Sequence, residues 1–303
     1  MKGFTDKDVT DQSGKCFVVT GANTGIGLGA AKVLAARGAR VLLGCRDKAK
    51  AEEAMSLIRG QTPGADVAYL PLDLADLASV RTAAEIAAAE PRIDVLLNNA
   101  GVMFPPLSRT KQGFELQFGV NHLGPFALTA LLLPKLGETA GSRVVVTSSL
   151  AHQRGNIEWD DLNAERSYSR AQRYSDSKLA NMLHFFELDR RLRASGAAVT
   201  AIGCHPGVAA TELMRYAGPF RVFTPLFGLL LNNADQGAWP ALQAAVDPST
   251  EPGGYYGPQS MGGMKGPSAQ AVRTQAAQDR EMAGRLWDVS VEMTGIDPGL
   301  APA

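Results

Sequence analysis

The sequence predicts an α/β fold in which one doubly wound domain surrounds a central parallel sheet. Short, nearly all-apolar runs recur along the first two thirds of the 303 residues, and amphipathic stretches with helical spacing separate them. A glycine-rich turn joins the first apolar run to the first helical stretch. Strands that are buried on both faces and alternate with helices form parallel sheets with right-handed crossovers. We therefore expect a single domain over residues 1–303, without internal repeats.

The predicted elements alternate in the order that such a fold requires. The expected strands cover residues 16–20, 41–43, 67–70, 95–97, 144–146 and 199–202, and the expected helices cover residues 27–37, 48–59 and 77–89. Residues 248–267 are rich in proline and glycine, which predicts a loop region within a C-terminal extension over residues 248–303.

The composition argues against several classes of partner. Thirty basic and thirty acidic side chains cancel, which gives no electrostatic reason to expect a nucleic acid as a partner. Cys16, Cys45 and Cys204 lie far apart and form neither a metal-ligand pattern nor a disulfide framework, and we expect the first two to be buried thiols. No metal site is expected.

No targeting or membrane segment is expected either. The first fifteen residues are polar and lack the apolar region of a signal peptide. No stretch approaches the roughly 18 apolar residues of a transmembrane anchor. The nearest candidate, residues 220–231, is short and contains Arg221 and Pro225. We expect a cytoplasmic protein.

The turn after the first strand reads Thr20-Gly21-Ala22-Asn23-Thr24-Gly25-Ile26-Gly27. Glycine allows the backbone to approach a pyrophosphate closely, and the following helix N-terminus supplies oriented N–H donors. Structural turns use glycine for the same torsional reason, but the position between a strand and a helix favours a dinucleotide site. The spacing G-x-x-x-G-x-G differs from the G-x-G-x-x-G fingerprint.

This turn resembles the TGxxxGIG loop of the short-chain dehydrogenase/reductase family, whose members have a Rossmann-type domain. Further stretches resemble the family's motifs in the same order: Asn98-Asn99-Ala100-Gly101 its NNAG, Asn121 its helix-borne asparagine, Ser148-Ser149 its strand-end serine, Tyr174-Ser175-Asp176-Ser177-Lys178 its YxxxK, and Pro206-Gly207 its PG turn. The resemblance covers most of the chain. It implies an NAD(P)-dependent oxidoreductase that interconverts an alcohol and its carbonyl compound by hydride transfer.

Tyr174 and Lys178 stand four positions apart and would share one face of a helix, a spacing that alone is typical of a solvated helix face. A free phenol has a pKa near 10, and a neighbouring ammonium is expected to lower it, which suits general acid–base catalysis. The resemblance implies this role for Tyr174. Tyr168 is a second tyrosine nearby, but Gln172, four positions on, carries no charge.

The resemblance implies two further catalytic residues. Ser149 would orient the substrate oxygen, whereas the adjacent Ser148 would point to the opposite face of the strand. Either serine could instead cap a local turn. Asn121 would link Lys178 to solvent through water. Alternatively, Asn121 could be a buried structural residue that forms hydrogen bonds with backbone groups.

Arg46 stands at the end of the second strand, where NAD-preferring enzymes usually place an acidic residue for the ribose 2′-OH. A guanidinium can bind a 2′-phosphate there, so we expect NADP(H), with NAD(H) as the alternative. A surface arginine without this role is the structural alternative. The other expected cofactor contacts are Gly21, Asn23, Thr24, Gly25, Ile26, Gly27, Asp73, Leu74, Asn99, Ala100, Gly101, Tyr174, Lys178, Pro206, Gly207, Val208 and Thr211.

Three stretches resemble the retinol dehydrogenase branch of the family: Ala-Asn-Thr-Gly-Ile-Gly at 22–27, Ser-Ser-Leu-Ala-His at 148–152 and Ser-Lys-Leu-Ala-Asn at 177–181. The resemblance implies that residues 215–231 form a helical lid over the substrate. Their apolar side chains favour a hydrophobic alcohol or carbonyl compound, because burying its surface stabilises binding. Retinoid, steroid, long-chain and aromatic compounds all stay open. The same residues could instead form core or a subunit interface, since family members are commonly homodimers or homotetramers.

Two rival functions belong to other classes. A regulatory protein could sense NADP(H) on the same scaffold without turnover, although such proteins usually lack the tyrosine or the lysine. A membrane-associating module could use residues 220–231. Neither rival explains why the chain keeps Tyr174 and Lys178 together with the serine and asparagine.

Overall fold

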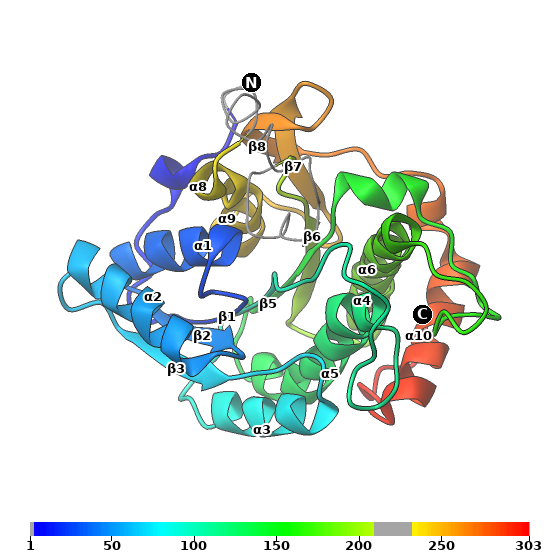
Figure 1. Ribbon diagram of the computed structural model, residues 1–303. Helices are drawn as coiled ribbons and strands as arrows, with labels where there is room; N and C mark the ends of the chain where they lie inside the picture. The colour runs from blue at the N-terminus through cyan, green and yellow to red at the C-terminus, as the bar shows by residue number, and fades with distance from the viewer. Residues whose placement is uncertain (1–2, 209–231, 303) are drawn as a thin grey trace.

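The computed structural model describes residues 3–208 and 232–302, and an eight-stranded sheet of Rossmann type forms its centre (Figure 1). The strand order is β3-β2-β1-β4-β5-β6-β7-β8, with β1 to β7 parallel and β8 antiparallel to β7. The strands are β1 (Cys16–Thr20), β2 (Arg40–Cys45), β3 (Val67–Pro71), β4 (Val95–Asn98), β5 (Arg143–Thr147), β6 (Thr200–Cys204), β7 (Tyr255–Ser260) and β8 (Lys265–Gln270). The predicted doubly wound fold is confirmed.

Helices cover both faces of the sheet (Figure 1). One face carries α1 (Gly25–Ala36), α2 (Lys48–Gln61) and α9 (Trp239–Val246), with the short α8 (Ala234–Gly237) beside α1. The other carries α3 (Leu77–Ala88), α4 (Leu116–Phe118), the π-helical turn η2 (Gly119–Leu123), α5 (Gly124–Gly137), α6 (Arg170–Ala194) and α10 (Arg280–Thr294). Short 3₁₀ turns are η1 (Asp6–Asp8), η3 (Leu150–Arg154) and η6 (Ala276–Gln278).

Alternation along the strands divides the core between these two faces. In β1, Val18 belongs to the cluster under α3, α5, α6 and α10, whereas Phe17 and Val19 belong to the cluster under α1, α2 and α9. All three side chains are fully buried. Burial on both faces explains why this strand is a continuous apolar run in the sequence.

Capping residues place the helix ends. Asp47, Asp76, Ser169 and Asp279 each accept a hydrogen bond from a backbone N–H in the first turn of α2, α3, α6 and α10. Gly295 ends α10 in the left-handed conformation, with φ at 62°. Local sequence therefore defines where these four helices begin.

The expected loop region over residues 248–267 is wrong, because β7 and the start of β8 lie there. Glycine and proline weaken the sequence signal for a strand. Here Pro258 lies at an irregularity in the β7–β8 register. A Cβ on Gly257 would collide with the imidazole of His205, so glycine is required for packing against the end of β6.

Segments α4, η2 and α5 form one continuous apolar helix, Leu116–Gly137, which the sequence analysis did not predict. By length and hydropathy it could cross a membrane, although the sequence analysis expected no such stretch. However, 89% of its apolar window is buried inside the domain, as in a core helix. The expected lid, residues 215–231, lies outside the described residues.

A buried aromatic cluster joins α10 to the body of the domain. The His184 ring on α6 stacks on Trp287 of α10 at 6.1 Å between centroids and lies edge-on to His122 at 5.7 Å. His122 Nε2 donates to Ser290 Oγ at 2.8 Å, because that hydroxyl itself donates to the Leu286 carbonyl. Burial lowers the pKa of His184 to about 4 and that of His122 well below its ordinary value.

We expect His184→Phe to flatten the pH dependence of the free energy of unfolding. His184 has a lower pKa in the folded protein than the ordinary value near 6.5, so the unfolded chain binds more protons as the pH falls. Neutral His184 makes its full contribution to the free energy of unfolding above about pH 6.5. This contribution falls by about 2 kcal/mol between pH 7.5 and pH 5. Urea denaturation of both proteins across this range measures the difference. Identical pH dependence in the two proteins would contradict the prediction.

Candidate active site

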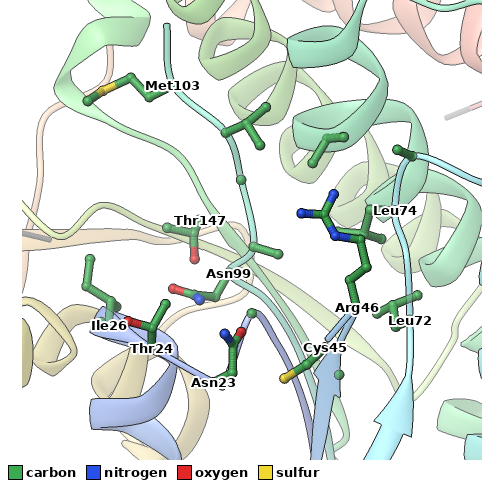
Figure 2. A pocket seen from close by; sticks show the side chains of 18 of the residues that line it. Asn23, Thr24, Ile26, Cys45, Arg46, Leu72, Leu74, Asn99, Met103 and Thr147 are labelled. Carbon is green, nitrogen blue, oxygen red and sulfur yellow. The ribbon is translucent and has the colours of Figure 1, made fainter. Parts of the chain in front are cut away.

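The carboxyl ends of the parallel strands open into a cavity of about 350 Å³ (Figure 2). It lies where ligands bind in doubly wound folds, around the point between β1 and β4 at which the strand order reverses. The structure brings together most of the expected site residues in its lining: Gly21, Asn23, Thr24, Gly25, Ile26, Arg46, Asp73, Leu74, Asn99, Ala100, Gly101, Tyr174, Lys178 and Pro206. Expected residues outside this lining are Gly27, Asn121, Ser149, Gly207 and Val208, and Thr211 lies outside the described residues.

Two loops meet in the crevice between β1 and β4. Thr20 Oγ1 accepts the N–H groups of Asn99 and Ala100 at 3.0 Å each, and Asn99 Nδ2 donates to the Thr20 carbonyl at 3.0 Å. A Cβ on Gly27 would lie 2.6 Å from Asn99 Nδ2 and would collide with the Gly21 carbonyl. Gly27 thus lets the two loops approach each other. Sequence reasoning assigned no role to Thr20, although a hydroxyl at a strand end was the available signal.

Arg46 extends from the end of β2 past Leu74 (Figure 2). It is exposed and forms no ion pair within residues 3–208 and 232–302. The neighbouring Asp47 uses a carboxylate oxygen to accept the Lys50 N–H at 3.2 Å as the cap of α2. Lys50 also lines the cavity. The cavity lining thus holds Arg46 and Lys50 together with the carboxylates of Asp47 and Asp73. The Arg46 guanidinium is free to hold a phosphate group.

Tyr174 and Lys178 lie on one buried face of α6. Lys178 Nζ is 5.7 Å from the centroid of the Tyr174 ring and donates to the Thr147 carbonyl at 3.3 Å. Burial lowers the pKa of Lys178 to about 8. Burial also raises the pKa of Tyr174 to about 12, although a hydrogen bond with Ser149 acts in the opposite direction. The pKa of this phenol is therefore raised and not lowered as expected, because desolvation outweighs the hydrogen bond with Ser149.

The two serines after β5 make different contacts. Ser148 is buried, and its hydroxyl donates to the Lys178 carbonyl at 2.8 Å. The Ser149 hydroxyl accepts the Ala151 N–H at 3.2 Å, as the cap of η3, and also bonds to the Tyr174 phenol. Ser149 is thus the serine that shares a hydrogen bond with the tyrosine. Its backbone is held by His152, whose Nδ1 lies 2.6 Å from the Ser149 carbonyl.

Asn121 lies in the π-helical turn η2 and is buried. Its Oδ1 accepts the Val102 N–H at 2.7 Å, and its Nδ2 donates to the Val102 carbonyl at 3.0 Å and to Ser177 Oγ at 2.9 Å. These bonds match the structural alternative of an asparagine that satisfies backbone groups. A Cβ on Gly101 would lie 3.0 Å from Asn121 Oδ1 and 3.5 Å from Lys178 Nζ, so both atoms border the same small space.

The residues around the cavity fit a nicotinamide dinucleotide. The N-terminus of α1 and Gly25, with φ at 57°, present backbone N–H groups suited to a pyrophosphate. Figure 2 shows Arg46 and Thr147 on opposite sides of the cavity, with Asn99 beside Thr147. Because Lys178 contacts Thr147, the charge of Arg46 and the Tyr174–Lys178 pair lie at opposite ends of the cavity.

Comparisons with known proteins give a consistent match. The family model of the short chain dehydrogenases matches residues 15–221. Retinol dehydrogenase 13 of Homo sapiens is 46% identical over 293 residues, which cover 94% of this chain and 86% of the relative. Retinol dehydrogenase 12 of Homo sapiens is 44% identical, over 93% of this chain and 87% of the relative. The crystal structure of an uncharacterised protein from Mycobacterium paratuberculosis is 39% identical with a TM-score of 0.83, over 99% of this chain and 100% of that chain.

We expect Thr20→Val to weaken dinucleotide binding by about tenfold or more, because two loop N–H groups lose their shared acceptor and each unsatisfied group costs about 1–3 kcal/mol. Thr20→Ser keeps the hydroxyl and is the matched control. Quenching of protein fluorescence by added dinucleotide measures both dissociation constants. Wild-type affinity in Thr20→Val would show that the hydroxyl does not organise the loop.

Proposed function

We propose that this chain, which belongs to the short-chain dehydrogenase family and to its retinol dehydrogenase-like branch, transfers a hydride between NADP(H) and a hydrophobic alcohol or carbonyl compound. Membership makes it an oxidoreductase that acts on alcohols with a nicotinamide cofactor. The proposal concerns the choice of cofactor, the class of substrate and the roles of individual residues.

The observation that carries the proposal is the contact between a buried phenol, a serine hydroxyl and a buried ammonium beside the cavity. Because the pKa of Tyr174 is raised, its Oη holds a proton at neutral pH and can give it to a carbonyl oxygen. Ser149, bonded to the same phenol, can donate to that oxygen and orient it. The bound dinucleotide supplies the hydride for reduction or accepts it in oxidation. In oxidation, Tyr174 must first release its own proton, and the resulting phenolate then takes the alcohol proton.

Lys178 and Asn121 are the proposed route by which Tyr174 regains its proton. Lys178 lies on the same helix face as the phenol, and burial brings its pKa to about 8, within reach of proton exchange at physiological pH. Asn121 borders the same space as the ammonium beside Gly101. A water held between them would connect the ammonium to solvent.

The position of Arg46 in the cavity lining supports NADP(H) over NAD(H). Arg46 is exposed at the end of β2, and the adjacent Asp47 is engaged in capping α2. A guanidinium can form two parallel hydrogen bonds to a 2′-phosphate, whereas the 2′-OH of NAD(H) would need an acceptor at this place.

Hydrophobic substrates are supported by apolar residues in the cavity lining and by the relatives. Met103, Pro105, Leu116 and Val120 line part of the cavity. Relatives at 44–46% identity carry the name retinol dehydrogenase, so a retinoid is the first compound to test. The apolar sequence of residues 215–231 favours the same class.

We expect Tyr174→Phe to reduce turnover by about a thousandfold while NADPH binding stays near wild type, because only the acid–base proton is lost. The assay follows NADPH absorbance with retinal, a steroid ketone, a long-chain aldehyde and an aromatic ketone. Wild-type turnover in Tyr174→Phe would rule out the mechanism. Tight NADPH binding by the wild type without turnover of any compound in a broad panel would favour the NADP(H)-sensing protein instead.

We expect Arg46→Asp to shift the preference from NADPH towards NADH, because a carboxylate repels the 2′-phosphate and accepts from the 2′-OH. Lys48→Asp is the matched control, since it makes the same charge change two positions away at a residue outside the cavity lining. The ratio of kcat/KM for the two cofactors is the measurement. Unchanged NADPH affinity in Arg46→Asp would remove Arg46 from the site.

A further inference from the structure

Phe104 has an unusual backbone conformation close to the catalytic tyrosine. Its φ is 59°, in the left-handed region that a bulky side chain rarely adopts. Such a conformation persists where surrounding contacts impose it, and it is frequent at functional sites.

Two side chains clamp the backbone at Phe104. The Phe104 N–H donates to Gln117 Oε1 at 3.0 Å, and Gln117 is fully buried. Gln117 Nε2 in turn donates to Tyr168 Oη at 3.3 Å and to the Arg170 carbonyl at 3.0 Å. Tyr168 Oη donates to the Pro105 carbonyl at 2.9 Å. Gln117 thus holds the Phe104 segment directly through Oε1 and indirectly through Tyr168, and its bond to the Arg170 carbonyl ties this arrangement to the start of α6.

The clamp holds the Phe104 ring against the ring of Tyr174. The two centroids are 5.4 Å apart and the ring planes meet at 79°, an edge-to-face arrangement that is favourable for aromatic pairs. Lys178 Nζ lies 5.7 Å from the centroid of the same Tyr174 ring. The phenol ring therefore has two defined neighbours besides the serine that bonds its hydroxyl.

We propose that Phe104 is a positioning residue for Tyr174, and that Gln117 and Tyr168 hold Phe104 in place. The proposal rests on the proposed function, because it requires Tyr174 to be the proton donor. The Phe104 ring restricts the tilt of the phenol so that Oη stays beside Ser149, and it keeps water from that ring. Tyr168, which lacks a charged neighbour four positions on, thereby acquires a role in the site without taking part in proton transfer.

The test compares Phe104→Leu, Phe104→Tyr and Tyr168→Phe with the wild type. We expect Phe104→Leu to lower kcat by about tenfold, the upper end of what one edge-to-face contact contributes, with an unchanged dissociation constant for NADPH. The alkaline limb of its pH–rate profile should move to lower pH, because water reaches the phenol. Phe104→Tyr keeps a ring and should restore kcat to within about twofold of the wild type. Tyr168→Phe should lower kcat by about threefold, since one clamp hydroxyl is lost.

Phe114→Leu is the matched control. Phe114 lies ten positions further along the chain, and its ring packs against the core. We expect its loss to leave the pH–rate profile unchanged and kcat within about twofold. An unchanged pH–rate profile and near wild-type kcat in Phe104→Leu would overturn the proposal, and so would equal losses in Phe104→Leu and Phe104→Tyr. Full activity of Tyr174→Phe would overturn the proposed function instead, so the two failures are distinguishable.

Discussion

The site depends on the close approach of two loops at the carboxyl ends of β1 and β4. The Thr20 hydroxyl accepts two N–H groups of the second loop, those of Asn99 and Ala100, and Gly27 leaves the space that the approach needs. The direction in which the second loop leaves β4 then determines where Val102 meets Asn121. The contact between these two loops thus helps to place the glycine-rich turn, which we propose binds phosphate, and Asn121, which we propose belongs to a proton relay.

Burial gives α6 its chemistry. The same desolvation moves the pKa values of the phenol and the ammonium in opposite directions, because each group is driven towards its neutral form. The phenol consequently keeps its proton while the lysine can lose one. A solvated helix face with the same two residues would have neither property, which is why their four-residue spacing alone is uninformative.

Local sequence predicted the strands from β1 to β6 and the first three helices, since apolar runs and caps are local signals. The helix Leu116–Gly137 escaped prediction because it is apolar all round and has no amphipathic pattern. β7 was not predicted because Gly257 weakens the local strand signal. Glycine is required there by packing against His205, a residue distant in the sequence. In the site, Tyr174 and Lys178 were found from a motif, whereas the burial that raises the pKa of the phenol depends on tertiary packing. Gln117 carries no local signal at all.

The π-helical turn at Gly119–Leu123 has a consequence for how the gene can vary. A π turn is equivalent to one extra residue in an α-helix, and here it carries the buried Asn121 in the middle of a core helix. Deleting one residue within this turn would restore a regular α-helix and keep the register of the downstream residues. Inserting one residue, or deleting one elsewhere in the helix, would rotate everything downstream by about 100°, given 3.6 residues per turn. The side chains of α5, buried nearly all round, would then face the wrong neighbours. Related sequences should therefore tolerate substitutions along this helix far better than changes in its length outside the π-helical turn.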